Sequence, residues 1–172
     1  MTLVNIAKDD TKPLFVDPSK ITAIQVLNAD ATGNELAVIL YNDKDRFLTG
    51  SLKDLNLDVA DMVKKLTDNG AQLLPLTMHS EGKEYPNFIA PKAVTFATIS
   101  QPEKDGKAGA IIGVKGAGRI ETWDGAAQTE IDNLIQAVRN AKPLFEYNPE
   151  IAYARWGSPA KLYIDPASVT RM

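Results

Sequence analysis

The chain has 172 residues, of which 44% are hydrophobic and 24% charged, with a formal net charge of -3. This balance is typical of a globular chain that buries a core, and it excludes intrinsic disorder. The absence of cysteine excludes disulfides, iron–sulfur clusters, thiolate zinc sites and thiol nucleophiles, and the negative charge makes nucleic acid an unlikely partner.

The sequence predicts no association with a membrane. Met1 to Ile6 contains neither a basic leader nor an apolar run, and no later segment approaches the roughly 20 apolar residues of a membrane span. We therefore expect a cytoplasmic protein, or a virion protein if a phage encodes it.

The first predicted unit, residues 1–75, is rich in short strands. Pro18 cannot donate to a strand ladder and marks a corner after the first strand. Apolar and β-branched runs predict strands at 15–16, 21–27, 36–41 and 46–50. A helix follows, since Asp58 is a suitable cap, Asn69-Gly70 is a stop signal, and an apolar stripe lies between them at Val59, Met62, Val63 and Leu66.

The second predicted unit, residues 76–148, repeats the first. The segment around Pro18 recurs around Pro91, with an aromatic and a β-branched residue before each proline and a β-branched residue and Thr after it. The same offset pairs Arg46 with Arg119 and Thr49 with Thr122. A tandem duplication explains this order of shared features.

A helix also closes the second unit. After one deletion, its apolar stripe aligns with that of the first unit and consists of Ile131, Leu134, Ile135 and Val138. Asp124 or Thr129 would begin this helix, and Pro143 would end it by Lys142. The predicted fold class is α+β, with two antiparallel, strand-rich units that each carry one helix.

A partial third unit is predicted at residues 149–172, because the proline motif occurs once more around Pro166. We expect a hairpin of residues 160–164 and 168–172. An isolated hairpin is marginal in water, so it must dock. Docking between subunits is the favoured alternative, and docking within the chain is the other.

The motif of an aromatic and a β-branched residue before proline, followed by a strand, a polar turn and a helix of the Val-x-x-Met-Val type, resembles the short FlbD-type flagellar proteins and similar small β-rich proteins of bacteria and phages. The match covers residues 14–66 and 87–138. The resemblance implies a small non-enzymatic scaffold or binding module, and it brings no catalytic residues.

Several motifs point weakly to chemistry. The glycine-rich segment from Gly113 to Arg119 fits no phosphate-binding pattern and is predicted to be a hairpin turn. His79, the single histidine, is interpreted as a solvated linker residue, because no nucleophile and orienting carboxylate are evident around it. Turn and cap positions explain the spacing of Asp43, Asp45, Asp58 and Asp61. We expect no metal, no cofactor and no enzymatic activity.

Two sets of residues remain as candidate binding sites. Arginine and threonine at repeated positions, namely Arg46, Thr49, Arg119 and Thr122, would suit a small anionic ligand, although a polar outer strand face is the simpler interpretation. Residue types that are enriched at interfaces gather near the last hairpin, namely Tyr147, Tyr153, Arg155, Trp156 and Tyr163. Trp156 could equally fill the core between the units.

The sequence therefore favours a non-enzymatic assembly or interaction protein, either a homo-oligomer or a component of a larger particle such as a phage virion. Its partners would be copies of itself or other protein subunits. The alternative function is the binding or sequestering of a small anionic ligand at the repeated arginine and threonine positions.

Overall fold

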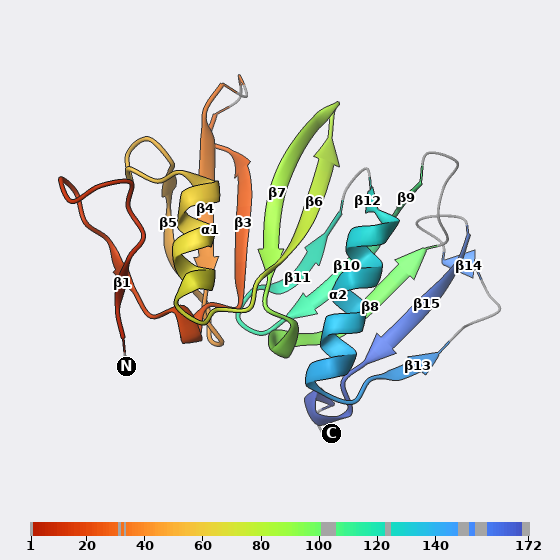
Figure 1. The fold of residues 1–172 in the computed structure, drawn as a ribbon. Coiled ribbons are helices and arrows are strands. Elements are labelled where there is room, and N and C mark those ends of the chain that lie inside the picture. Colours follow the sequence, from red (N-terminus) through yellow and green to blue (C-terminus); the bar gives the residue numbers. More distant parts are fainter. Residues whose placement is uncertain are drawn as a thin grey trace.

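The computed structural model describes residues 2–30, 32, 34–100, 106–122, 125–147, 152–153 and 158–169. In this part of the chain, two α-helices and antiparallel strands in several sheets form an α+β architecture, which confirms the predicted class. Figure 1 shows the two larger sheets next to each other, each with one helix over the near face.

Sheet 1 has five antiparallel strands in the order β5-β4-β3-β7-β6. Its strands are β3 (Ala23–Asn28), β4 (Leu36–Tyr41), β5 (Arg46–Ser51), β6 (Leu74–Ser80) and β7 (Lys83–Ile89). Strands β6 and β7 form a tight hairpin because Glu81 and Gly82 take positive φ angles of 51° and 77°. His79 therefore lies in strand β6, and its prediction as a linker residue was wrong.

Helix α1 (Val59–Asp68) covers one face of sheet 1, as Figure 1 shows. The Asp58 carboxylate accepts a hydrogen bond of 2.9 Å from the Asp61 amide, as expected of an amino-terminal cap. The buried stripe contains Met62 and Leu66, and Gly70 follows the helix with a φ of 95°. The sequence signals for this helix are thus confirmed.

Sheet 2 has the strand order β11-β10-β8-β15-β13, and a sixth strand, β14, pairs with β15 beside this path. Its strands are β8 (Val94–Ser100), β10 (Ala110–Val114), β11 (Gly118–Glu121), β13 (Phe145–Tyr147), β14 (Ala152–Tyr153) and β15 (Ser158–Ile164). The turn between β10 and β11 contains the glycine-rich segment, which is therefore a hairpin turn as predicted.

Helix α2 (Gln128–Ala141) packs on sheet 2 through Ile131, Leu134, Ile135 and Val138, all of them buried. It ends before Pro143, as predicted. Its start differs from the prediction, because Ala127 occupies the cap position without a side-chain hydrogen bond and Thr129 lies within the first turn. Asp124, the other predicted start, is outside the described residues.

Smaller elements complete the fold. Two short strand pairs occur, β1 (Val4–Asn5) with β2 (Phe15–Val16), and β9 (Lys107–Ala108) with β12 (Ala126–Ala127). Each repeated proline begins a short 3₁₀ helix, in η1 (Pro18–Lys20), η2 (Pro91–Ala93) and η3 (Pro166–Ser168). The proline motif is thus a corner after a strand in all three places.

The two large sheets have the same strand order. Reading each from its first edge, β5, β4, β3, β7 and β6 correspond to β11, β10, β8, β15 and β13. Most of the β6/β7 hairpin lies beyond residue 75, the predicted end of the first unit, yet the hairpin pairs with β3 and completes sheet 1. Strand β15 likewise pairs with β8 and completes sheet 2.

The predicted pairing of the last hairpin was wrong. Strand β15 lies between β8 and β13 of its own chain, so both of its edges are occupied. Residues Pro166 to Ser168 form η3 and not a strand, and residues 170–172 are outside the described part. The physical reason is that this segment holds the place in sheet 2 that β7 holds in sheet 1.

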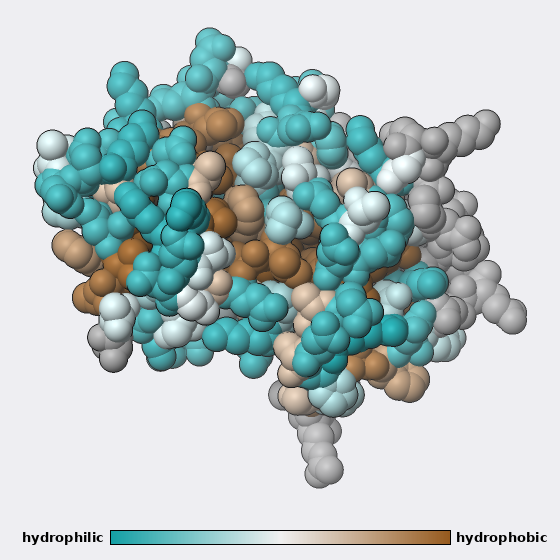
Figure 2. Space-filling view, in the orientation of Figure 1, coloured by the Kyte–Doolittle hydropathy of each residue, from teal (hydrophilic) through white to brown (hydrophobic). Residues whose placement is uncertain are grey.

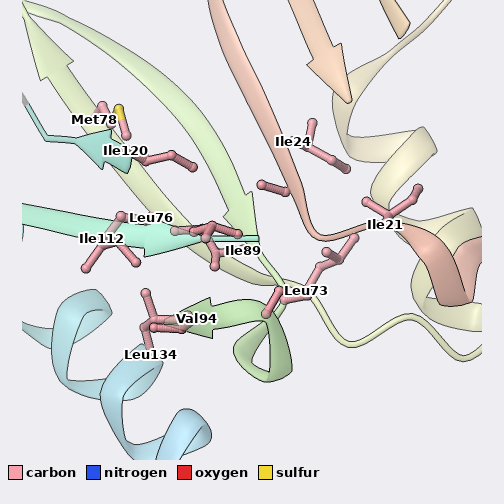
Figure 3. Packing of buried hydrophobic residues seen from close by; sticks show 14 of the residues in the cluster. Ile21, Ile24, Leu73, Leu76, Met78, Ile89, Val94, Ile112, Ile120 and Leu134 are labelled. Carbon is pink, nitrogen blue, oxygen red and sulfur yellow. The ribbon is translucent and has the colours of Figure 1, made fainter. Parts of the chain in front are cut away.

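One hydrophobic core joins both halves of the molecule. Figure 3 shows Leu76 and Ile89, from the hairpin of sheet 1, beside Ile112 and Ile120 of sheet 2. All four side chains are at most 1% exposed. The face of the β6/β7 hairpin that is opposite α1 is therefore buried against the second half of the chain.

Candidate interaction surface

The inner face of sheet 2 is the face that α2 covers. Residues paired directly across neighbouring strands point to the same side, so one row of this face is formed by Ile120, Ile112, Ala97, Tyr163 and Glu146. The Arg139 guanidinium lies over the Tyr163 ring, with Cζ 5.3 Å from the ring centre. Burial raises the pKa of the Tyr163 phenol. Tyr163, predicted at an interface, thus belongs to the packed inner face.

The opposite side of sheet 2, here called the outer face, carries the rows on either side of that one. One row consists of Arg119, Gly113, Phe96, Ile164 and Phe145, and the other of Glu121, Ile111, Thr98, Leu162 and Tyr147. At the β13 end, Phe145 is 60% exposed and Tyr147 is 54% exposed. Figure 2 shows the side of the molecule on which α2 lies, so the outer face is turned away from the viewer in that figure.

Gly113 lets an aromatic ring lie flat on this outer face. A Cβ atom at Gly113 would be 2.3 Å from ring atoms of Phe96, a separation that no side chain tolerates. The ring of Phe96 thus fills the space above the glycine, and this contact needs a residue without a side chain.

A hollow lies where the outer face meets the last corner. It has a volume of about 320 Å³ and is lined by Thr95, Phe96, Leu162, Ile164, Ser168 and Val169. Val169 is 65% exposed. Together, the apolar side chains around this hollow form what we call the apolar patch: Phe96, Phe145, Tyr147, Leu162, Ile164 and Val169.

Tyr147 of the apolar patch is exposed, whereas the residue at the corresponding position of sheet 1 is buried. The strand partner of Ile164 is Phe145, and Tyr147 stands two residues after it. In sheet 1, the partner of Ile89 is Leu74, and Leu76 stands two residues after it. Leu76 is 0% exposed, in contrast to 54% for Tyr147. Contiguous exposed aromatic and aliphatic side chains mark interaction surfaces, whereas scattered single ones need no explanation.

An ion pair holds the corner beside the apolar patch. Lys142 Nζ lies 2.9 Å from Asp165 Oδ2, and Asp165 also accepts hydrogen bonds from the Ala167 amide and the Ser168 hydroxyl, both at 3.0 Å. Burial of this carboxyl favours its neutral form, but the hydrogen bonds outweigh burial and lower its pKa. Asp165 therefore fixes η3 to the end of α2.

We expect Asp165→Ala to reduce the free energy of unfolding at pH 7 by about 3 kcal/mol, because Lys142 would lose its partner in a mostly buried place. A carboxyl with a lowered folded pKa stabilises the protein above its unfolded pKa of about 4, and this contribution is lost as the pH falls through the folded value. Denaturant titrations at pH 7 and pH 3 should show the difference between wild type and variant shrinking at the lower pH.

Asp17→Ala is the matched control for this ion pair. Asp17 caps η1 through the Ser19 amide and hydroxyl, and within the described part of the chain no lysine forms an ion pair with it. Asp17→Ala should reduce the free energy of unfolding by less than Asp165→Ala does. Equal losses would show that the cap alone, and not the ion pair, stabilises these corners.

The other aromatic residues predicted at an interface are only partly described. Tyr147 lies on the outer face and is exposed. Tyr153 lies in β14 and pairs with Ser158. Arg155 and Trp156 are outside the described residues. Of the residues on the outer face, the sequence pattern singled out Tyr147 but not Phe145, Leu162 or Ile164.

The repeated arginines and threonines do not form one site. Arg46 and Thr49 are exposed on β5, and Arg119 pairs with Glu121 at 3.3 Å. Thr122 is 1% exposed, and its hydroxyl accepts a hydrogen bond of 2.9 Å from the Ala110 amide. This threonine is therefore occupied by the backbone and not directed at a ligand.

The two threonines also differ in register. Strand β5 has a bulge at Phe47, so Thr49 pairs with Ile39, and the corresponding pair in sheet 2 is Glu121 with Ile111. Thr122 comes one residue later. Since a one-residue slip moves a side chain to the other face of a sheet, the predicted equivalence of Thr49 and Thr122 was wrong.

The remaining candidate residues lie at separate places in the described part of the chain. His79 Nδ1 lies 3.9 Å from Glu84 Oε1 across the β6/β7 hairpin. No three His, Asp or Glu side chains gather in a way that could hold a metal ion, as far as the chain is described. Asp58 caps α1, and Asp43 and Asp45 lie in the turn after β4.

A second hollow, of about 280 Å³, opens where β3 and β7 diverge. It is lined by Gln25, Val26, Leu27, Asn28, Ile39, Met78, Ser80, Tyr85 and Asn87. Asn87 joins the two strands here, since its side-chain oxygen accepts a hydrogen bond of 3.0 Å from the Val26 amide. Among the described residues, no lysine or arginine lines this hollow, so its lining does not add support for an anionic ligand.

No family model, curated protein or solved structure matches this chain. Within the described residues, neither helix has the length and apolar character that crossing a bilayer requires. The apolar patch is therefore the feature of the molecule from which a function can be inferred.

Proposed function

We propose that this protein is a non-enzymatic assembly protein that binds protein subunits, in the first place copies of itself, through the apolar patch on sheet 2. The observation that carries the proposal is the exposure of three side chains. Val169 lines the hollow, and Phe145 and Tyr147 are the strand partners of Ile164 and Leu162, which also line it. The two aromatic side chains supply large contact areas at a low cost in conformational entropy.

The repeated architecture supports the same proposal. We infer that sheets 1 and 2 derive from one duplicated unit, because they share their strand order and the register of their last hairpin. In sheet 1, the face of that hairpin opposite α1 is buried against sheet 2. The face that is buried in sheet 1 is exposed in sheet 2, so we expect it to bind a partner there.

A charge placed on the patch should abolish assembly. We expect wild-type protein to exceed the monomer mass of 18.7 kDa as its concentration rises, and Phe145→Asp and Tyr147→Asp each to return to that mass. Both side chains are exposed, so the thermal midpoint should change by no more than about 2 °C. Sedimentation velocity and light scattering measure the mass, and calorimetry measures the midpoint.

Phe47→Asp is the matched control, since Phe47 is an exposed aromatic residue, at 41%, on the edge strand of sheet 1. It should keep the wild-type mass at every concentration. A wild-type chain that remains at 18.7 kDa up to about 1 mM would refute self-assembly, because contacts weaker than this are not specific associations.

A further inference from the structure

Three strand pairs in the described part of the chain precede a proline corner in the same register. The residue two places before each proline is Val16, Ile89 or Ile164, and it pairs with Val4, Leu74 or Phe145 respectively. The β1/β2 pair at the start of the chain is thus a short counterpart of the β6/β7 and β13/β15 pairs.

Equivalent positions next to these pairs are buried for the first two pairs and exposed for the third. The residues two places after Val4, Leu74 and Phe145 occupy equivalent positions. They are Ile6, Leu76 and Tyr147, whose side chains are 0%, 0% and 54% exposed. Three residues after the proline stand Ile21, Val94 and Val169, at 2%, 1% and 65%. The same surface is therefore covered twice and uncovered once.

A helix lies beside the first strand of each buried pair. Strand β6 packs beside α2, and the Glu130 carboxylate accepts hydrogen bonds from the Thr77 amide and hydroxyl at 3.0 and 3.1 Å. Strand β1 packs beside α1, and Lys65 Nζ donates to the Ala7 carbonyl. The β13/β15 pair has the corresponding patch, opposite its own helix α2.

We infer that the apolar patch of one copy binds the first unit of a second copy. In this contact, the β13/β15 pair of the first copy lies beside α1 of the second copy and takes the place of the second copy's own β1/β2 pair. This inference rests on the proposed function and names its partner surface. Helix α2 of the second copy is not expected to bind the patch, because β6 already lies beside it. Strand β6 has seven residues and is paired along its length within sheet 1, so it is not easily displaced.

The β1/β2 pair is the replaceable element. Each of its strands has two residues, and the segment is tied to the rest of the chain by few backbone bonds, such as that from the Lys8 amide to the Asn56 carbonyl at 2.9 Å. Short two-stranded pairs are marginal by themselves. The contact is heterologous, so repeated addition gives a ring or a filament and not only a dimer.

Amide hydrogen exchange of the full chain tests this exchange of partners. The Ile6 amide donates to the Leu14 carbonyl and the Lys8 amide to the Asn56 carbonyl, both at 2.9 Å. We expect both amides to lose protection by about tenfold or more as the concentration is raised into the range where the mass increases. In Tyr147→Asp, their protection should be independent of concentration.

A variant of the displaced segment gives a second measurement. Ile6→Ala removes a fully buried side chain from the closed form and leaves the apolar patch intact. It should therefore lower the concentration for assembly by about tenfold or more, and adding Tyr147→Asp should abolish that assembly. Aggregation of a merely destabilised chain would persist in the double variant, and this result would overturn the inference.

The two proposals fail in different ways. A wild-type mass that rises with concentration while Ile6 and Lys8 stay protected supports assembly through the patch but refutes the displacement of β1/β2, and it points to a symmetric contact between patches. A mass that does not rise refutes both. A rising mass with loss of protection in wild type, and neither in Tyr147→Asp, is the expected result.

Discussion

Replacing Leu76 with alanine should reduce the free energy of unfolding by about 3 kcal/mol, which is typical of a leucine removed from a well-packed core. Leu76 is 0% exposed and lies beside Ile112 and Ile120 where the two sheets meet (Figure 3). The cavity would open between the two halves of the molecule, so neither half could close it by itself. Denaturant titration followed by fluorescence measures the loss.

Tyr147→Ala is the matched control, because Tyr147 holds the same register position in sheet 2. Its side chain is 54% exposed, so the monomer should lose no more than about 0.5 kcal/mol, while assembly should be lost. Comparable losses of monomer stability for both variants would mean that the patch is part of the core, and the proposed interaction surface would be wrong.

Gly116→Ala should be at least as damaging. Gly116 has a φ of 81°, and a Cβ atom there would be 1.6 Å from the carbonyl oxygen of Asn42. The left-handed conformation alone costs an alanine about 1–2 kcal/mol, and the turn before β11 would also have to move away from the turn after β4. We expect a total loss above about 3 kcal/mol in thermal or denaturant unfolding.

Gly118→Ala separates these two effects. Gly118 has a similar φ of 73° in the same hairpin, but a Cβ atom there would meet nothing within 4 Å. Gly118→Ala should therefore reduce the free energy of unfolding only by the conformational cost of about 1–2 kcal/mol. Equal losses at the two glycines would show that the contact between the two turns contributes nothing to stability.

Much of the local structure could be predicted, since its signals lie close together in the sequence. The proline corners, the apolar runs of β3 and β4, and helix α1 between Asp58 and Gly70 all follow from short-range rules. The start of α2 was missed because Ala127 provides no side-chain cap. A helix held mainly by the packing of its apolar stripe does not need one.

The candidate surface was only partly predictable. Tyr147 was singled out as an aromatic residue, but Phe145 was not, although Phe145 and Tyr147 alternate as Leu74 and Leu76 do before Pro91. That spacing was the available signal. Whether such residues are buried or exposed depends on what packs against them, and this is a property of segments far apart in the chain.

Local patterning alone was sufficient to define an α+β chain with proline corners, because backbone geometry and apolar periodicity act over a few residues. The partners of the strands depended on the tertiary fold. The segment after Tyr153 has the motif of a new unit, yet β15 enters sheet 2, where both of its edges find hydrogen-bond partners. The bulge at Phe47 shifted one strand by a residue, so Thr49 is exposed and Thr122 is buried. Sequence repetition reveals which surfaces are alike, and long-range packing determines which of them is left uncovered.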